Sequence, residues 1–179
     1  MDDILWAPWR LAYIAENERE RQERSARDEQ NRVEVRPDGD PGCFLCQAVA
    51  DPERKRRLVI GRSENTIALL NKFPYNNGHL LLAPLRHVGR LDRLSETEQA
   101  ELTRELNRLV IRLEEKMRPH GFNIGLNLGH AAGAGLPGHL HWHIVPRWNG
   151  DTNFMTSIAS TKVIPQALEA LWEILAEPS

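Results

Sequence analysis

Residues 139–146 read HLHWHIVP, and this stretch decides how the chain folds around it. Histidine and apolar positions alternate with the period of two that is typical of a β-strand. The two faces of the strand are His139, His141 and His143 on one side, and Leu140, Trp142 and Ile144 on the other. The apolar face is expected to serve the core, so the three imidazoles are expected to line an open surface of a sheet.

Three neighbouring imidazoles on one face require partners, because a buried polar group without a hydrogen bond is destabilising. Two chemistries fit this pattern: a metal site with His-x-His ligands, and an imidazole nucleophile that attacks phosphorus. The preceding residues favour the second. The segment GHAAGAGLPG (residues 129–138) is a glycine-rich loop of the kind that offers N–H groups to phosphate. Asn127, at the end of the strand before it, has an amide that can donate to an anion.

The rest of the chain predicts an α+β fold with an antiparallel sheet of about five strands. The expected strands are residues 58–60, 66–71, 79–85, 122–128 and 139–146. SETE, at residues 95–98, is a capping box, and it opens one long helix that reaches Met117 before Pro119 and Gly121 stop it. A second helix is expected at the C-terminus, over residues 165–177.

Composition limits the class of protein. The chain has 179 residues, of which 41% are apolar, and a net charge of −2. These values predict one domain over residues 1–179, with an aromatic N-terminal arm (1–14) and a charged insert (15–40), and they give no reason to expect nucleic acid or a membrane as partner. Only two cysteines are present, and neither a spanning segment nor a signal peptide is evident, so a cytoplasmic location is expected.

Several motifs resemble the histidine triad family of nucleotidyl hydrolases and transferases. HLHWHIVPRW is similar to that family's His-x-His-x-His signature. Residues 68–88 resemble its block of strand, proline loop and Pro-x-x-His, and residues 127–135 resemble its phosphate loop. LWAPWRLAYI, CFLC and VPRWNGDTNFM resemble the branch that includes diadenosine tetraphosphate phosphorylases and hydrolases. The resemblance covers most of the chain outside residues 15–40. It implies a HIT-like fold, adenine nucleotides or dinucleoside polyphosphates as substrates, and a homodimer in which two sheets join.

The resemblance also implies roles for particular residues. His141 would attack the α-phosphorus and form a nucleotidyl-histidine, which water or phosphate resolves. His143 would donate a hydrogen bond to a phosphate oxygen, and His139 would complete the triad. The positions implied for substrate binding are Asn127, Gly133 and Gly135 for the phosphate, Asn71 for the ribose, and Phe44 and Phe73 for the base. For the two phenylalanines, an ordinary place in the core is the alternative.

A structural zinc ion is the second implication. Cys43 and Cys46 form a Cys-x-x-Cys pair, whose spacing suits one tetrahedral ion. Family members with this pair complete the site with two histidines, which are His87 and His139 here. The ion would pin the N-terminal strand region to the triad strand. Two unligated thiols are the alternative, and a redox pair would need a strand-to-helix context that residues 40–49 show poorly.

Some alternatives stay open from the sequence. The loop AAGAGLPG (residues 131–138) lacks the Gln and Ser or Thr of many family members, so its phosphate contacts would come mainly from the backbone and the leaving group is not defined. The rival functions are a phosphoramidase that acts on nucleotide adducts, a purine-nucleotide-binding module without turnover, and a catalytic metal on all three histidines. His79 and His120 are interpreted as surface or strand-end histidines.

Overall fold

The structure, a computed structural model, describes residues 32–151 and 166–177. The chain divides into two units, and the one described here consists of residues 33–149 and the C-terminal helix. The aromatic arm and most of the charged insert lie outside the described residues. The expectation of a single domain over residues 1–179 therefore stays a prediction.

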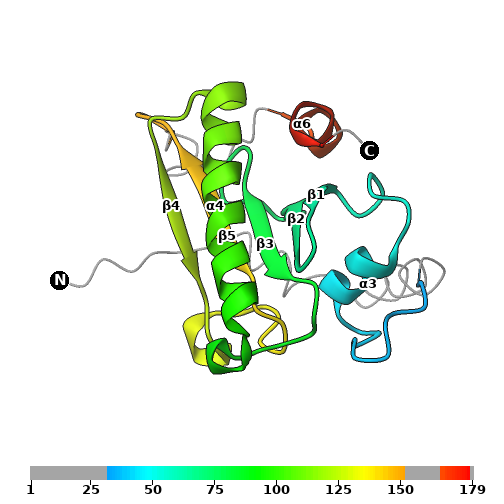
Figure 1. The fold of residues 1–179 in the computed structure, drawn as a ribbon. Coiled ribbons are helices and arrows are strands. Elements are labelled where there is room, and N and C mark those ends of the chain that lie inside the picture. The colour runs from blue at the N-terminus through cyan, green and yellow to red at the C-terminus, as the bar shows by residue number, and fades with distance from the viewer. Residues whose placement is uncertain (1–31, 152–165, 178–179) are drawn as a thin grey trace, which may run out of the picture. The chain divides into compact units, whose positions relative to one another are not determined.

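The described elements follow the α+β order expected from the sequence (Figure 1). They are α3 (Phe44–Ala50), β1 (Val59–Arg62), β2 (Thr66–Leu70), β3 (Leu80–Pro84), the short 3-10 helix η1 (Leu91–Arg93), α4 (Glu96–Met117), β4 (Gly121–Leu126), the 3-10 helix η2 (His130–Ala132), β5 (Trp142–Arg147) and α6 (Leu168–Leu175). The strand region expected at the two cysteines is wrong, because the chain forms the helix α3 there, with Cys43 as its N-cap.

The five strands of the described residues form one sheet in the order β1-β2-β3-β5-β4, and each neighbouring pair is antiparallel. The predicted antiparallel sheet is therefore confirmed. Strand β5 lies between β3 and β4, and His143 is paired with Leu81 on one side and with Gly125 on the other. This central position gives the triad neighbours from two other strands.

The sheet is covered on both faces at β2 and β3, which explains the uninterrupted burial of these two strands. Alternate residues of these strands serve two different apolar clusters. Ala68, Leu70, Leu80 and Leu82 pack with residues of α4 and α6, whereas Ile67, Leu69, Leu81 and Ala83 pack with α3. The unit therefore has three layers, with the long helix on one side of the sheet and the cysteine-bearing helix on the other. Figure 1 shows α4 lying along the sheet.

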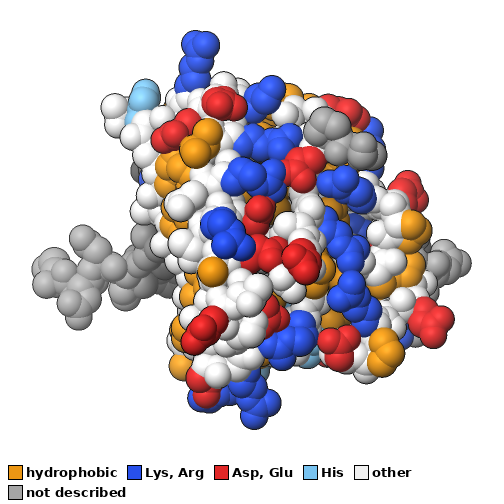
Figure 2. All heavy atoms as spheres, in the orientation of Figure 1, with side chains coloured by type: hydrophobic (Ala, Val, Ile, Leu, Met, Phe, Trp, Pro, Cys, Tyr) orange, Lys and Arg blue, Asp and Glu red, His pale blue; other side chains and the backbone are white. Residues whose placement is uncertain are grey.

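The long helix begins and ends where the sequence predicted. Ser95 caps it, because its side chain accepts a hydrogen bond from the Glu98 N–H while the Glu98 carboxylate accepts one from the Ser95 N–H. Arg118 closes it in the left-handed conformation, with φ of 50°, directly before Pro119. On the face of the molecule drawn in Figure 2, acidic and basic side chains lie interspersed. This distribution agrees with a small net charge.

Candidate active site and metal centre

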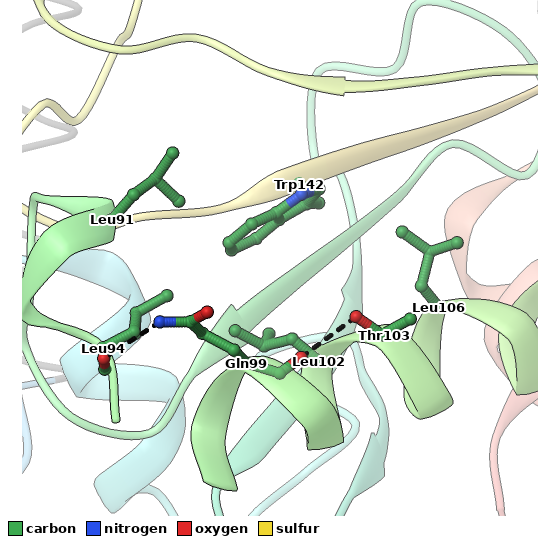
Figure 3. Close-up of a pocket in the computed structure, with 7 residues that line it drawn as sticks. All are labelled: Leu91, Leu94, Gln99, Leu102, Thr103, Leu106 and Trp142. Atoms are coloured by element: carbon green, nitrogen blue, oxygen red, sulfur yellow. Dashed lines mark hydrogen bonds between the residues drawn. The ribbon is translucent and has the colours of Figure 1, made fainter. Parts of the chain in front are cut away.

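The triad lies on the face of β5 that is turned away from α4. Trp142 and Ile144 belong to the α4 side, and Figure 3 shows the Trp142 ring among Leu102, Leu106 and other residues that line a pocket of about 320 Å³ there. The alternation predicted for residues 139–146 is therefore confirmed on its apolar face. Regular strand geometry begins only at Trp142, so His139 and His141 precede the strand proper.

His141 has one ring nitrogen committed to the backbone. Its Nδ1 lies 2.9 Å from the carbonyl oxygen of His139. Because a carbonyl oxygen can only accept, Nδ1 carries the proton and Nε2 keeps its lone pair. A neutral imidazole in this tautomer presents an unprotonated nitrogen, which is what a nucleophile requires.

A second, buried histidine orients His143. His79 is only 1% exposed, and its Nε2 lies 3.0 Å from Nδ1 of His143. The Tyr75 N–H donates to Nδ1 of His79 at 2.9 Å, so His79 carries its proton on Nε2 and donates it to His143. His143 must then carry its own proton on Nε2. The interpretation of His79 as a surface residue is wrong, although it does immediately precede β3.

Burial keeps His143 neutral. Desolvation, and to a smaller degree the neighbouring His141, lower the pKa of His143 to about 4. The rings of the two residues are 5.2 Å apart between centroids. At neutral pH His143 is therefore an uncharged hydrogen-bond donor through Nε2, beside the free Nε2 of His141.

The polar face of β4 adjoins the triad, as the alternation of residues 122–128 suggested. Gly125 is paired with His143, and a Cβ built on this glycine would meet no atom within 4 Å. The missing side chain leaves space beside the imidazole. Asn127 follows the end of β4, and its Nδ2 lies 3.5 Å from the carbonyl oxygen of Gly133, in the middle of the glycine-rich loop.

The loop itself is a compact turn. Gly133 adopts a φ of 84°, which favours glycine, and its N–H donates to the His130 carbonyl at 2.9 Å. This N–H is thus already bonded within the turn. The N–H of Gly135 has no hydrogen-bond partner among the described residues. Of the two predicted phosphate-binding glycines, Gly135 is the one with an available donor.

The residues predicted for the nucleoside lie apart from the buried clusters. Asn71 directly follows β2, its Oδ1 accepts the Phe73 N–H at 2.9 Å, and its Nδ2 lies 3.3 Å from Nδ1 of His79. The Phe44 side chain is 45% exposed and the Phe73 side chain 57% exposed. The alternative that these two rings are ordinary core aromatics is therefore wrong.

A second set of side chains converges next to the triad. The ligand atoms of Cys43, Cys46, His87 and His139 all lie within 4.8 Å of one another, and this is the one such group among residues 32–151 and 166–177. Cys43 Sγ is 3.3 Å from Nδ1 of His139, and Cys46 Sγ is 3.2 Å from Nδ1 of His87. His141 and His143 do not belong to this group, so the described geometry does not favour a metal bound by all three triad histidines.

The donor set fits zinc. His139 donates from Nε2 to the Pro84 carbonyl at 2.9 Å, which leaves Nδ1 unprotonated and directed at the two sulfurs. Burial lowers the pKa of His139 to about 4 and raises the pKa of the Cys43 thiol to about 12. A neutral imidazole is ready to ligate, whereas a thiolate at Cys43 needs a bound cation to stabilise it. Two sulfur and two nitrogen donors with a backbone carbonyl behind the imidazole match a structural zinc site.

Comparison with known proteins identifies the family of the chain. A sequence model of the HIT domain matches residues 53–150. Over 172 residues the chain is 41% identical to AP-4-A phosphorylase of Mycobacterium tuberculosis (strain ATCC 25618 / H37Rv), covering 96% of this chain and 82% of that protein.

Solved structures of similar fold belong to the same family. A zinc-bound histidine triad family protein from Mycobacterium smegmatis superposes with a TM-score of 0.61 at 28% identity, covering 76% of this chain and 92% of that one. A hypothetical histidine triad nucleotide-binding protein, ST2152 from Sulfolobus tokodaii strain7, superposes with a TM-score of 0.60 at 25% identity, covering 74% and 89%. The chain belongs to the histidine triad (HIT) family.

Proposed function

We propose that the protein cleaves dinucleoside polyphosphates, with diadenosine tetraphosphate as the principal substrate, through a nucleotidyl-histidine at His141. One observation carries the proposal: the Nδ1–H of His141 is held by the His139 carbonyl at 2.9 Å, which leaves Nε2 free to attack. The 41% identity to a protein named AP-4-A phosphorylase, over 96% of the chain, supports this choice of substrate.

In the first step, the Nε2 lone pair of His141 forms a bond to the α-phosphorus, and the bond from that phosphorus to the bridging oxygen breaks. ATP leaves and AMP stays attached to the imidazole. The Nε2–H of His143 donates to a nonbridging phosphate oxygen as charge accumulates there. His79 keeps that proton on the correct nitrogen of His143, through the hydrogen bond between their rings.

The phosphate loop and the nucleoside contacts complete the proposed site. The Gly135 N–H and the Asn127 amide are the donors for the α-phosphate, while Gly133 serves to shape the turn. Asn71 is the proposed ribose contact. The exposed rings of Phe44 and Phe73 are available to stack on a base.

Phosphate is the proposed acceptor in the second step. One of its oxygens attacks the phosphorus of the adduct, the bond to Nε2 of His141 breaks, and ADP is released with the imidazole restored. Attack by water would release AMP instead. The relative named as a phosphorylase supports phosphate.

Zinc is proposed at the cluster formed by Cys43, Cys46, His87 and His139, where it would supply structural cross-linking and no chemistry. The cytoplasm is the proposed location, because nucleotide substrates and two reduced thiols suit a reducing compartment. Independently of this, no helix among the described residues is long and apolar enough to cross a membrane.

A second copy of the chain is the proposed partner, added at strand β4. The other edge of the sheet, β1, is covered: Trp172 Nε1–H donates to the Val59 carbonyl at 2.8 Å, and the Glu177 N–H donates to the Ile60 carbonyl at 2.7 Å. No further strand pairs with β4 in the part of the chain that the structure describes. Its apolar residue Ile124 is 44% exposed, so this edge has both free backbone and apolar surface to offer.

The deciding experiment is incubation with diadenosine tetraphosphate, with and without inorganic phosphate, followed by identification of the products. Phosphate-dependent formation of ADP and ATP is expected, together with an AMP adduct on His141 in rapidly quenched samples. AMP and ATP would make the protein a hydrolase. Cleavage of AMP-linked amines alone would favour the phosphoramidase, and AMP binding without any turnover would favour a binding module.

The variant His141→Ala separates chemistry from binding. It should abolish turnover and the adduct and still bind AMP, because it removes the nucleophile and leaves the other contacts. Turnover in this variant comparable to that of the unmodified protein would contradict the proposed role of His141.

A further inference from the structure

His139 is shared by the metal cluster and the catalytic triad. Its Nδ1 lies 3.3 Å from Cys43 Sγ and 3.7 Å from Cys46 Sγ, inside the cluster. Its own carbonyl oxygen accepts the Nδ1–H of His141 at 2.9 Å. One residue therefore contacts the metal ligands with its side chain and the nucleophile with its backbone.

We propose that occupancy of the metal cluster controls catalysis through His139, because the bound ion holds in place the carbonyl that keeps Nε2 of His141 unprotonated. His139 is then a positioning residue that never touches the substrate. The inference goes beyond a structural zinc, and it rests on the proposed function only in taking His141 as the nucleophile.

The hydrogen bonding of the His139 ring explains why an ion matters. With its proton on Nε2, the ring donates to the Pro84 carbonyl, and Nδ1 is left for a metal. With its proton on Nδ1, the ring would place an unprotonated Nε2 2.9 Å from that carbonyl oxygen, so that two acceptors would face each other. A metal on Nδ1 excludes the second tautomer. It thereby preserves the bond to Pro84.

The backbone around His139 transmits this constraint. The segment that follows β3 runs against the segment that enters the triad: the Leu140 N–H donates to the Val88 carbonyl at 2.7 Å, and a Cβ built on Gly89 would lie 2.6 Å from the Pro137 carbonyl oxygen. His87 belongs to the first segment and His139 to the second. An ion that binds both rings, whose centroids are 5.1 Å apart, would clamp these two segments directly beside His141.

The helix α3 supplies the other half of the clamp. Cys43 and Cys46 are buried at its start, and the Cys46 N–H donates to Cys43 Sγ at 3.4 Å. The hydrogen bonds of the two sulfurs join them to backbone N–H groups, His87 and His139, and none of these bonds reaches His141 or His143. A substitution at Cys46 can therefore remove a metal ligand without changing any group that meets the nucleotide.

The test compares Cys46→Ser with Leu45→Ala, a control that weakens the packing of the same helix and leaves the four ligands in place. Four quantities are measured for each protein: zinc content, kcat and KM with diadenosine tetraphosphate, the Kd for AMP, and the tautomer of His141 by nitrogen NMR of its ring. Cys46→Ser is expected to lose zinc and about tenfold to a hundredfold in kcat, the usual loss when a group that orients a site is removed.

In the same variant the Kd for AMP is expected to change by less than about twofold, while the His141 ring shows both tautomers instead of one. Leu45→Ala is expected to retain zinc, the single tautomer and kcat within about twofold, although it unfolds at lower urea. Wild-type protein stripped of metal by a chelator should behave like Cys46→Ser and recover when zinc is restored, which provides the same comparison if the variant does not fold.

The inference would be overturned by metal-free protein whose kcat stays within about twofold of the loaded form, or by a His141 tautomer that does not respond to zinc. A loss of kcat of equal size in Leu45→Ala would also overturn it, since general packing would then be the cause. Failure of the proposed function would give a different result, because zinc-loaded wild type would then not turn over the dinucleotide at all. The NMR comparison would still report whether zinc controls the tautomer of His141.

Discussion

His79 sets the protonation of His143, and this can be tested at a single residue. His79→Ala removes the Nε2–H that Nδ1 of His143 accepts, so the proton of His143 is free to move to the wrong nitrogen. We expect kcat to fall about tenfold to a hundredfold with KM much less affected, because the bond acts on charge that develops during the reaction. Steady-state kinetics on the dinucleotide provides the measurement.

Two further variants make this prediction specific. His79→Gln keeps an N–H donor at about the same reach and should recover part of the lost kcat, which a purely structural role would not predict. His120→Ala is the matched control, because that exposed imidazole accepts the Asn149 N–H beyond the end of β5, and its removal should leave kcat unchanged. Equal losses in the Ala and Gln variants of His79 would argue against the hydrogen bond as the cause.

The lowered pKa of His143 predicts a dependence of stability on pH. The native ring stays neutral down to about pH 4, whereas in the unfolded chain it ionises near its ordinary value of 6.5. The contribution of this ring to the free energy of unfolding is therefore complete above about pH 6.5. As the pH falls from there toward 4, the free energy of unfolding decreases by about 1.4 kcal/mol per pH unit. Urea unfolding of wild type and His143→Gln at several pH values measures it, and parallel curves for the two proteins would contradict the assignment.

At the residue scale, the sequence predicted those groups whose residues recur at a short, regular spacing. The alternation of residues 139–146 identified the triad face, and Cys43 and Cys46 identified half of the metal cluster. His79 could not be assigned in this way, because its partner His143 is 64 positions away and the two meet only through the pairing of β3 with β5. Its one local signal is a histidine placed directly before an apolar strand, which is a weak one.

The long helix α4 offers a prediction at the element scale. Ser95→Ala removes the side chain that accepts the Glu98 N–H at 3.1 Å. The free energy of unfolding should fall by about 1 kcal/mol, the typical value of a lost N-cap. Activity should not change, since this end of the helix is on the opposite side of the sheet from the triad. Thermal and urea unfolding, with kcat measured alongside, would check both statements.

Thr97→Ala is the control for this helix. Thr97 is exposed within the first turn and alanine is the better helix former, so this variant should be as stable as wild type or slightly more so. A Ser95→Ala protein with unchanged stability would mean that the Glu98 carboxylate, which also accepts from Arg86 at 2.8 Å, holds the helix start without the serine.

Elements differed in how well the sequence predicted them, and length and capping explain why. The helix α4 has 22 residues with a full capping box, so its beginning and its end were both predictable. The helix α3 has seven residues and is capped by the Sγ of Cys43, which is not a usual capping group, so nothing in residues 43–50 distinguished it from a strand. The C-terminal helix was expected over residues 165–177 and is formed over Leu168–Leu175.

At the scale of the whole molecule, local patterns determined the strands but not their order. The chain places β5 between β3 and β4, so the triad touches β3 across a connection that contains the entire long helix. Such pairings depend on which apolar faces meet, and alternation within one strand does not encode this. The resemblance to the histidine triad family supplied the expectation of a HIT-like fold, and the matching solved structures confirm it.

The open edge at β4 leads to the last prediction. Ile124 stands on the apolar face of this edge strand, paired with Ile144 of β5, with 44% of its surface exposed. If a second copy adds its own β4 here, a charge at this position would be buried without a partner and would oppose association. Ile124→Glu should therefore sediment as a monomer under conditions where wild type sediments as a dimer.

The matched control is Ile174→Glu, which places the same charge on α6, the helix that bonds to the opposite edge of the sheet, at a side chain that is 38% exposed. It should remain dimeric, because that edge is already covered within the chain. A dimeric Ile124→Glu protein, or dissociation by the α6 variant alone, would exclude β4 as the contact. Comparing kcat in the two variants would then show whether each triad works independently, as expected from a site whose described catalytic and metal-binding residues all lie within one chain.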